Sequence, residues 1–215
     1  MNGNSNIDNK KVKVAIAGVG NCASALLQGI SFYGNTYRND NDKKGNNQTV
    51  EGVEGQNIPE GLIAYTLGDI KPADIEFVAA FDVVESKVGH DLADAIFASP
   101  NNTIKISNVP TSGIKVYKGK VLDGVGKRLN ERVKISDKPA ADVSKILKDS
   151  GAEILINYLP VGSRQATQYY VEQCLDAGVS FINAIPVFIA STPKWQQAFA
   201  SKNLLCAGDD VMSQL

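Results

Sequence analysis

The stretch GVGNCA at residues 18–23 has the residue types and spacing of a dinucleotide-binding turn, G-x-G-x-x-[G/A]. In such turns the first glycine allows a tight bend, the second lets a pyrophosphate approach the backbone, and the last small residue lets a helix pack closely on the preceding strand. The N-terminus of that helix offers free N–H groups to the anion, and Ser24 could add a hydroxyl. The alternative is a glycine turn that only joins a strand to a helix.

An acidic residue that could hold the ribose of such a ligand follows a second apolar run. Residues 75–81, IEFVAAF, have the composition of a buried strand, and Asp82 comes directly after them. A carboxylate there accepts hydrogen bonds from ribose hydroxyls and repels a 2′-phosphate, which favours NAD over NADP. An Asp that only caps the turn after the strand is the alternative.

Strands and helices must bring these two features together. Residues 12–17 are expected to form the strand before the turn and 21–33 the helix after it, while 34–73, rich in Asn, Gly and charge, is interpreted as a partly disordered surface insertion. Apolar runs and amphipathic stretches then alternate, with strands expected at 114–117, 153–159, 179–185 and 204–207 and helices at 85–97, 140–148, 163–177 and 193–201.

This alternation predicts an α/β fold, Rossmann-like and doubly wound, with a mainly parallel sheet and helices on both of its faces. Gly151 and Gly178 are expected to stop two of the helices in the left-handed conformation, and Thr192 to cap the N-terminus of another. We expect a flexible N-terminus at 1–11 and one NAD-binding domain over 12–215.

Composition narrows the function classes. The formal net charge of -1 gives little support to nucleic-acid binding. No apolar run reaches the ~18 residues that would indicate a membrane span, and the polar N-terminus lacks the apolar core of a secretory signal. The three cysteines lie too far apart for a disulfide framework or a metal cluster, which favours a cytoplasmic protein with reduced thiols.

Six stretches, in order along the chain, resemble one enzyme family: VAIAGVGNCASALLQG, EFVAAFDVVESKVGHDLADAIFASPNNTIKI, LDGVGK, YLPVGS, FINAIPVFIAS and GDDVMSQ. They resemble myo-inositol-1-phosphate synthase, also called inositol-3-phosphate synthase, of the actinobacterial and archaeal type. The resemblance implies an isomerase of inositol and phospholipid biosynthesis. It would convert D-glucose 6-phosphate to 1D-myo-inositol 3-phosphate by oxidation, intramolecular aldol cyclisation and reduction, with NAD regenerated. It also implies a homo-oligomer, a tetramer in the family.

The same resemblance implies roles for residues that match its motifs. Asp209 and Asp210 would stand beside the nicotinamide as the catalytic pair, and a cation of unknown identity could lie between a carboxylate and the pyrophosphate. Pro186 would lie near the nicotinamide or the sugar. The residues expected to bind the cofactor are Gly18, Gly20, Asn21, Cys22, Ala23, Ser24, Asp82, Leu159, Pro160, Val161, Gly162, Ser163, Asn183, Ala184 and Asp209.

Two departures from the family pattern limit this expectation. Met212 stands where the family has a lysine of the cationic cluster thought to hold the sugar phosphate, and a thioether neither carries positive charge nor donates a hydrogen bond. The sequence also stops at Leu215, before the family's catalytic and tetramerisation domain. We expect this chain alone to bind NAD with little or no turnover. A non-catalytic paralogue or partner of a full-length synthase is the alternative.

For several other residues, a structural role is the alternative to a functional one. Asp123 and Gly124, in LDGVG, either form a turn or reach the cofactor. Cys22 could have a lowered thiol pKa at a helix N-terminus, but a small packed residue is the simpler reading. His90 is interpreted as a surface or partly packed histidine, and Trp195 as a helix packing anchor.

Overall fold

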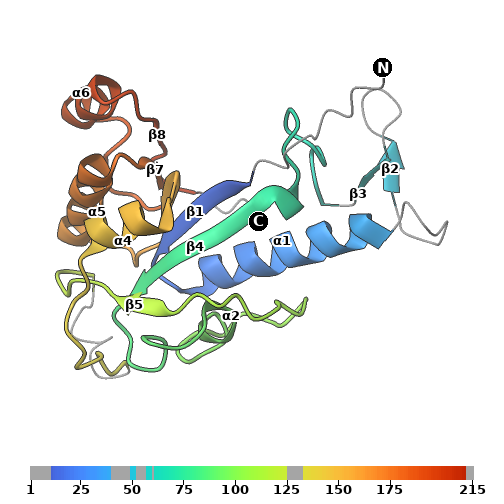
Figure 1. The fold of residues 1–215 in the computed structure, drawn as a ribbon, viewed down its shortest axis with the longest axis horizontal. Helices are drawn as coiled ribbons and strands as arrows, with labels where there is room; N and C mark the ends of the chain where they lie inside the picture. Colours follow the sequence, from blue (N-terminus) through green and yellow to red (C-terminus); the bar gives the residue numbers. More distant parts are fainter. Residues whose placement is uncertain (1–10, 40–48, 52–56, 60, 125–132, 212–215) are drawn as a thin grey trace, which may run out of the picture.

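A six-stranded parallel sheet organises the molecule. The computed structural model describes residues 11–39, 49–51, 57–59, 61–124 and 133–211. The strand order is β5-β4-β1-β6-β7-β8, and every neighbouring pair runs parallel (Figure 1). The strands are β1 (Val12–Ala17), β4 (Ile75–Asp82), β5 (Val116–Lys118), β6 (Ile154–Asn157), β7 (Ser180–Asn183) and β8 (Cys206–Ala207). The chain begins at the central strand β1, adds β4 and β5 on one side, and then adds β6, β7 and β8 on the other. This order confirms the expected Rossmann-like α/β fold.

Helices cover both faces of this sheet. They are α1 (Asn21–Asn39), α2 (Leu92–Ala95), α4 (Val143–Ser150), α5 (Arg164–Ala177) and α6 (Pro193–Ser201), with a short 3-10 turn η1 (Pro72–Asp74) before β4. Figure 1 shows α4, α5 and α6 grouped on one side of the central strands and α1 with α2 on the other. None of the helices in the described part of the chain has the length and apolar character that a membrane crossing requires.

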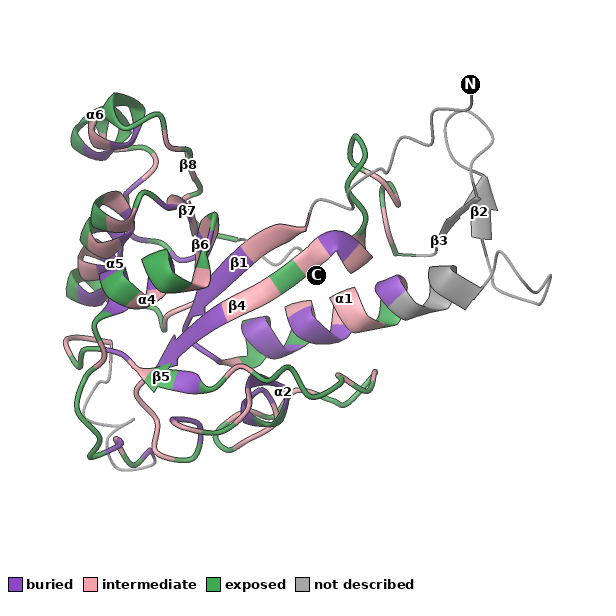
Figure 2. Cartoon of the chain, viewed as in Figure 1, coloured by how far each residue is buried: buried purple, intermediate pink, exposed green. Residues whose placement is uncertain are grey.

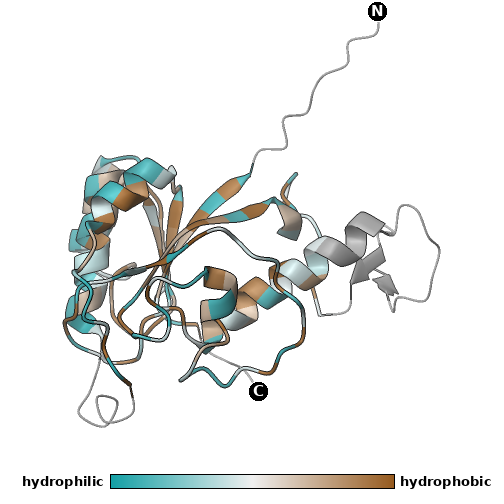
Figure 3. Ribbon diagram, turned by 60° about the horizontal axis from the view of Figure 1, so that its bottom comes forward, coloured by the Kyte–Doolittle hydropathy of each residue, from teal (hydrophilic) through white to brown (hydrophobic). Residues whose placement is uncertain are grey.

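The residues of β1 and β4 divide between two hydrophobic clusters because successive strand residues point to opposite faces. Ala15 and Ala17 belong to the cluster with α4, α5 and α6, whereas Ile16 between them belongs to the cluster with α1 and α2. Phe81 and Ala80 divide in the same way. Both strands become more buried toward their carboxyl ends (Figure 2). Much of the length of the strands is hydrophobic (Figure 3).

Several helix ends follow the local sequence as expected. Gly151 ends α4 with φ 64° and ψ 30°, and Gly178 ends α5 with φ 75° and ψ 36°. Both are left-handed conformations that glycine adopts without steric cost. The helix α6 begins at Pro193, directly after Thr192, but the Thr192 hydroxyl donates to the Phe188 carbonyl at 2.9 Å and does not cap the helix. The prediction of its position was therefore right and that of its capping bond was wrong.

The helix expected over 85–97 is largely absent. Only Leu92–Ala95 is α-helical, and Gly89 has φ 90°, which interrupts a right-handed helix. The Gly89 N–H donates to the Val116 carbonyl at 2.8 Å, and the Val116 N–H donates to the His90 carbonyl at 2.9 Å. This segment therefore forms hydrogen bonds to β5 instead of a continuous helix. Its apolar residues have helical spacing in the sequence, but several of them lie in turns.

The stretch expected as an insertion, 34–73, is only partly described. It contains the end of α1, a small antiparallel pair formed by β2 (Thr49–Glu51) with β3 (Asn57–Pro59), and η1. Despite this long connection β1 and β4 are direct neighbours. The expected disorder within the stretch and at the N-terminus falls largely on residues 1–10, 40–48, 52–56 and 60, which lie outside the described residues.

Two phenylalanines on neighbouring parts of the fold allow a matched test of the core. Phe181 on β7 is fully buried, whereas Phe188 is 76% exposed. Phe181→Ala should lower the free energy of unfolding by about 3–5 kcal/mol, because it removes buried surface and leaves a cavity. Phe188→Ala should change it by less than about 0.5 kcal/mol. Urea unfolding followed by circular dichroism measures both, and equal losses would contradict this assignment of the core.

Candidate functional site

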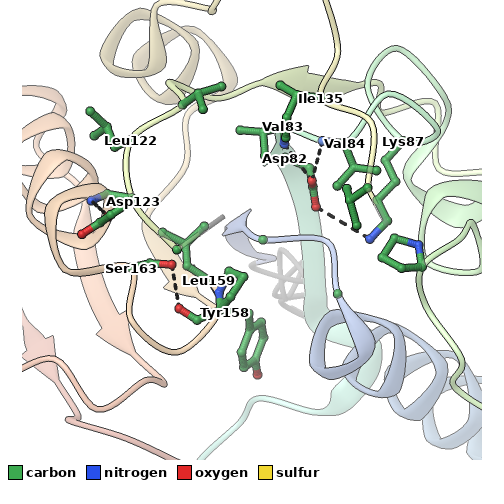
Figure 4. A pocket seen from close by; sticks show the side chains of 18 of the residues that line it. Asp82, Val83, Val84, Lys87, Leu122, Asp123, Ile135, Tyr158, Leu159 and Ser163 are labelled. Carbon is green, nitrogen blue, oxygen red and sulfur yellow. Dashed lines mark hydrogen bonds and ion pairs between the residues drawn. The ribbon is translucent and has the colours of Figure 1, made fainter. Parts of the chain in front are cut away.

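A cavity of about 240 Å³ lies where β1, β4 and β6 end (Figure 4). This is the point where the strand order reverses direction, and ligands of open α/β sheets bind in the crevice at such a point. Apolar side chains form much of its wall, among them Val83, Ile135 and Leu159. Two charged side chains, Asp82 and Lys87, lie together on one side of it.

The turn after β1 contributes two glycines with different surroundings. Gly18 has φ 92°, and a Cβ added there would lie 2.6 Å from the Tyr158 carbonyl oxygen. No side chain fits at this crossing of two backbones. Gly20 lines the cavity, and an added Cβ would meet nothing within 4 Å. The turn thus has the close backbone packing and the open cradle that the sequence pattern predicts for a dinucleotide phosphate.

Asp82 is 9% exposed and its carboxylate ties the ends of β1 and β4 together. One oxygen accepts a hydrogen bond from the Val19 N–H at 2.8 Å. The other accepts from the N–H groups of Val83 at 2.7 Å and Val84 at 2.9 Å. The turn-capping role is therefore present, and Asp82 also lines the cavity, where a ribose contact stays a prediction.

Lys87, which the sequence reading did not single out, is the cation next to this carboxylate. It is 2% exposed, and its ammonium lies 3.9 Å from Asp82 Oδ2. Burial lowers the pKa of Lys87, and the Asp82 charge opposes part of that change. The sequence did not reveal this residue, because a lysine within the helix expected over 85–97 would ordinarily face solvent.

The residues expected after the second glycine do not all face the cavity. The Asn21 side chain lines it and bonds to the loop opposite, donating to Asn102 Oδ1 at 2.7 Å. Ala23 is fully buried against the sheet, as its small size predicts. Ser24 is also fully buried, and its hydroxyl oxygen accepts from Gln28 Nε2 at 3.3 Å. In this arrangement Ser24 serves helix packing and is not turned toward a ligand.

The loop after β6 forms another wall. Leu159, Pro160 and Ser163 line the cavity, and the Ser163 hydroxyl donates to the Pro160 carbonyl at 2.6 Å. Val161 is 76% exposed at the tip of this loop, and Gly162 follows it with φ 95°.

Asp123 reaches the same wall from the loop after β5 (Figure 4). Its carboxylate accepts from the N–H groups of Gln165 at 2.6 Å and Ala166 at 2.9 Å. It therefore caps the N-terminus of α5, where a carboxylate is favoured by the free N–H groups and the helix dipole. Asp123 is thus a helix cap at the cavity wall, and the cofactor contact that the sequence left open stays a prediction.

A chain of polar side chains crosses the ends of β6, β7 and β8. Asn157 and Asn183 are buried, and Asn157 Nδ2 donates to Asn183 Oδ1 at 2.8 Å. Asn183 Nδ2 donates in turn to Asp209 Oδ1 at 2.8 Å. Sequence reading missed Asn157, which only its place opposite Asn183 in the strand register makes recognisable.

The Asp209 carboxylate is also held by the loop after β7. It accepts from the N–H groups of residues 189–191 at 2.9, 3.0 and 3.2 Å and from the Ser191 hydroxyl at 2.7 Å. Burial alone would raise its pKa, but the hydrogen bonds from Asn183, Ala190, Ser191 and Ile189 lower it. The carboxylate is thus held ionised and fully bonded.

Asp210 is exposed, with φ 74°, and neither it nor Asp209 lines the cavity at β1. Met212 lies outside the described residues.

A second cavity of about 760 Å³ lies between α1 and the segment 62–72. It is mainly apolar, and Cys22, Ala184 and Val211 belong to its border. Tyr158 lines both cavities. Most of the residues expected to bind the cofactor are therefore divided between the two cavities and the polar chain across β6, β7 and β8, and the exceptions are Ala23, Ser24, Val161 and Gly162.

The bonding of Asp209 gives a testable pH dependence. Asp209→Asn should lower the free energy of unfolding by about 2 kcal/mol at pH 7, because an amide cannot replace the carboxylate as acceptor. A carboxyl pKa that is lower in the folded state stabilises the fold above about pH 4, and this contribution is lost as the pH falls through the folded-state value. The difference between wild type and variant, measured by urea unfolding, should therefore shrink below pH 4.

Asp210→Asn is the matched control, since Asn also tolerates a left-handed backbone. It should change stability by less than about 0.5 kcal/mol. If the loss in free energy of unfolding caused by Asp209→Asn did not change with pH, the Asp209 carboxylate of the wild type would not be held ionised by these bonds.

Comparison with known proteins gives the relationship of the chain. No family model matches it. The inositol-3-phosphate synthase of Mycolicibacterium smegmatis is 44% identical over 205 residues, covering 95% of this chain and 52% of that protein. The protein of the same name from Corynebacterium glutamicum is 45% identical over 204 residues, with the same two shares. The chain spans about half the length of the curated relatives it matches.

A solved structure has a similar fold. The crystal structure of Ari2 has a TM-score of 0.73 and 30% identity to this chain, and the match covers 95% of this chain and 56% of that one. The chain is a homologue of inositol-3-phosphate synthases, and it corresponds to about half of their length.

Proposed function

We propose that this chain binds NAD in the cavity at the ends of β1, β4 and β6, as the NAD-binding part of a protein of the inositol-3-phosphate synthase type. The observation that carries the proposal is the pair of glycines. Gly18 brings the backbone of the turn against β6, and Gly20 leaves an open cradle on the cavity side. A pyrophosphate needs such an approach to the backbone and to a helix N-terminus.

The remaining parts of the cavity suit the other parts of this ligand. Asp82 would accept hydrogen bonds from the adenosine ribose and repel a 2′-phosphate, so we expect NAD to be preferred over NADP. Val83, Ile135 and Leu159 offer apolar walls of the kind that adenine requires. NAD, when bound, would supply reversible acceptance of a hydride.

The substrate class follows from the relatives. Proteins named inositol-3-phosphate synthase share 44–45% identity with this chain. D-glucose 6-phosphate is therefore the proposed substrate, 1D-myo-inositol 3-phosphate the product, and a cytoplasmic homo-oligomer the proposed state. No group of three or more potential metal ligands occurs among the described residues. A cation between a carboxylate and the pyrophosphate stays a prediction.

A second candidate is a chain that binds NAD without turnover. Asp209, expected beside the nicotinamide, has its carboxylate fully engaged by the loop at 189–191, Ser191 and Asn183. A carboxylate bonded in this way is a poor proton acceptor. We therefore propose that the chain alone binds NAD with little or no inositol phosphate formation.

Gly20 gives the sharpest test of the NAD site. Gly20→Ala should leave the thermal unfolding temperature nearly unchanged, because its Cβ meets no protein atom within 4 Å. It should weaken NAD binding by at least about tenfold, because the methyl group occupies the space of the pyrophosphate. Isothermal titration of the chain with NAD and with NADP measures both the affinity and the preference.

Gly29→Ala is the control. Gly29 also has nothing within 4 Å of an added Cβ, but it lies further along α1 and lines the second cavity. This variant should bind NAD like the wild type and be more stable by up to about 1 kcal/mol, since alanine is the better helix former. Absence of NAD binding to the wild type, or equal loss in both variants, would reject the proposed site.

Turnover is tested separately with the purified chain, NAD and D-glucose 6-phosphate. We expect inositol phosphate formation at or near the background of the uncatalysed mixture, because the Asp209 carboxylate is already engaged by five hydrogen bonds. A parallel reaction with the homologous Mycolicibacterium smegmatis protein verifies the assay. Inositol phosphate formed at a comparable rate by this chain would refute the second candidate and establish the full reaction.

A further inference from the structure

Lys87 is a buried cation to which the NAD proposal gives no task. It is 2% exposed although it lines the cavity. Burying an ammonium group is costly unless the group is paired and hydrogen-bonded. Its partners therefore indicate what the residue does.

The main partner of Lys87 is the backbone of the glycine turn. Its Nζ donates to the Val19 carbonyl at 2.7 Å and to Asn101 Oδ1 at 2.8 Å. Asn101 Nδ2 donates to the same Val19 carbonyl at 3.1 Å. This carbonyl lies between the two glycines of the turn and is held by two donors, one of which is charged. Charge-assisted bonds of this kind are about twice as strong as neutral ones.

The other side of Val19 is held as well. Its N–H donates to Asp82 Oδ2, which lies 3.9 Å from the Lys87 ammonium. The peptide groups before and after Val19 are therefore both fixed by this ion pair. Because a trans peptide group is planar, its N–H and C=O point in opposite directions. By holding the Val19 carbonyl, Lys87 sets the direction of the Gly20 N–H at the open cradle.

We propose that Lys87 is a positioning residue for the dinucleotide: it fixes the peptide between Val19 and Gly20 so that the turn is preformed for a pyrophosphate. This inference rests on the proposed NAD site. It is distinct from the ribose contact expected of Asp82, because it acts on the backbone of the turn. A pyrophosphate-bearing ligand should therefore depend on Lys87 more than a ligand that ends at the ribose.

The test compares ADP-ribose with adenosine, which lacks phosphates, on the full chain. Lys87→Met removes both hydrogen bonds and the charge, and should weaken ADP-ribose by about tenfold or more, the equivalent of one lost charge-assisted bond. Lys87→Gln keeps one neutral donor and should lie between. Lys87→Arg keeps charge and donors and should restore binding to within about threefold. Adenosine, titrated by NMR, should change by less than about threefold throughout.

Lys202→Met is the control for loss of a lysine, since Lys202 is exposed directly after α6. It should bind both ligands like the wild type. Thermal unfolding of each variant reports whether it is folded. If Lys87→Met does not fold, the comparison uses Lys87→Gln and Lys87→Arg. The affinity for ADP-ribose relative to that for adenosine should then be lower in Lys87→Gln than in Lys87→Arg, and equal ratios overturn the inference.

The outcomes separate this inference from the proposal on which it rests. A wild-type chain that binds neither NAD nor ADP-ribose overturns both. A wild-type chain that binds ADP-ribose, with Lys87→Met binding it equally well, overturns only the role of Lys87. Equal losses of ADP-ribose and adenosine also overturn it, because they would show an effect on the ribose side or on the whole cavity.

Discussion

The contact between the backbones of Gly18 and Tyr158 determines the arrangement of the sheet edge. The Gly18 N–H donates to the Phe81 carbonyl and the Tyr158 N–H donates to the Ala17 carbonyl, both at 2.8 Å. The chain leaving β1 is thus bonded to both neighbouring strands as it turns. A Cβ at Gly18 would lie only 2.6 Å from Tyr158 and would force β1 and β6 apart. The cavity, its glycine cradle and the neighbouring loops all depend on this approach.

Three carboxylates hold the loops at this edge of the sheet by accepting hydrogen bonds from backbone N–H groups. Asp82 holds the turn after β4 and the turn after β1, Asp123 holds the first turn of α5, and Asp209 holds the loop after β7. Each of them brings two separate segments together, because at least one of its donors lies far from it in the sequence. The loops at the carboxyl ends of the strands are therefore organised before any ligand binds, which reduces the ordering cost of binding.

The order of strands and helices could be read from the sequence because apolar runs, helical periodicity and stop residues agreed with one another. Gly18, Gly20 and Asp82 could be placed for the same reason, since a known turn geometry relates them. The irregular segment 83–91 could not. Its apolar spacing resembles a helix, and only the bonds of Gly89 and His90 to Val116 reveal another path.

The site was predicted less completely than the fold, because side-chain direction depends on tertiary contacts. Ser24 fits the glycine motif in sequence, yet it is buried beside Gln28. Lys87 carries no motif, and its role follows only from a carbonyl 68 positions away in the chain. Asp209 matched a family motif, but its five donors become visible only when the loop at 189–191 is in place.

The polar chain across β6, β7 and β8 has a direction to which the charge of Asp209 contributes. An ionised carboxylate can only accept, so Asn183 must present its NH2 group to Asp209. This leaves the Asn183 oxygen for Asn157, which must in turn present its own NH2 group. The Ile185 and Val187 carbonyls also accept from Asn183 Nδ2, at 3.1 and 2.6 Å, so the carboxylate and two backbone groups together set the orientation of this buried amide and, through it, of Asn157. Protonation of Asp209 would remove the charge from one end of this chain and leave the two backbone carbonyls to hold the Asn183 amide.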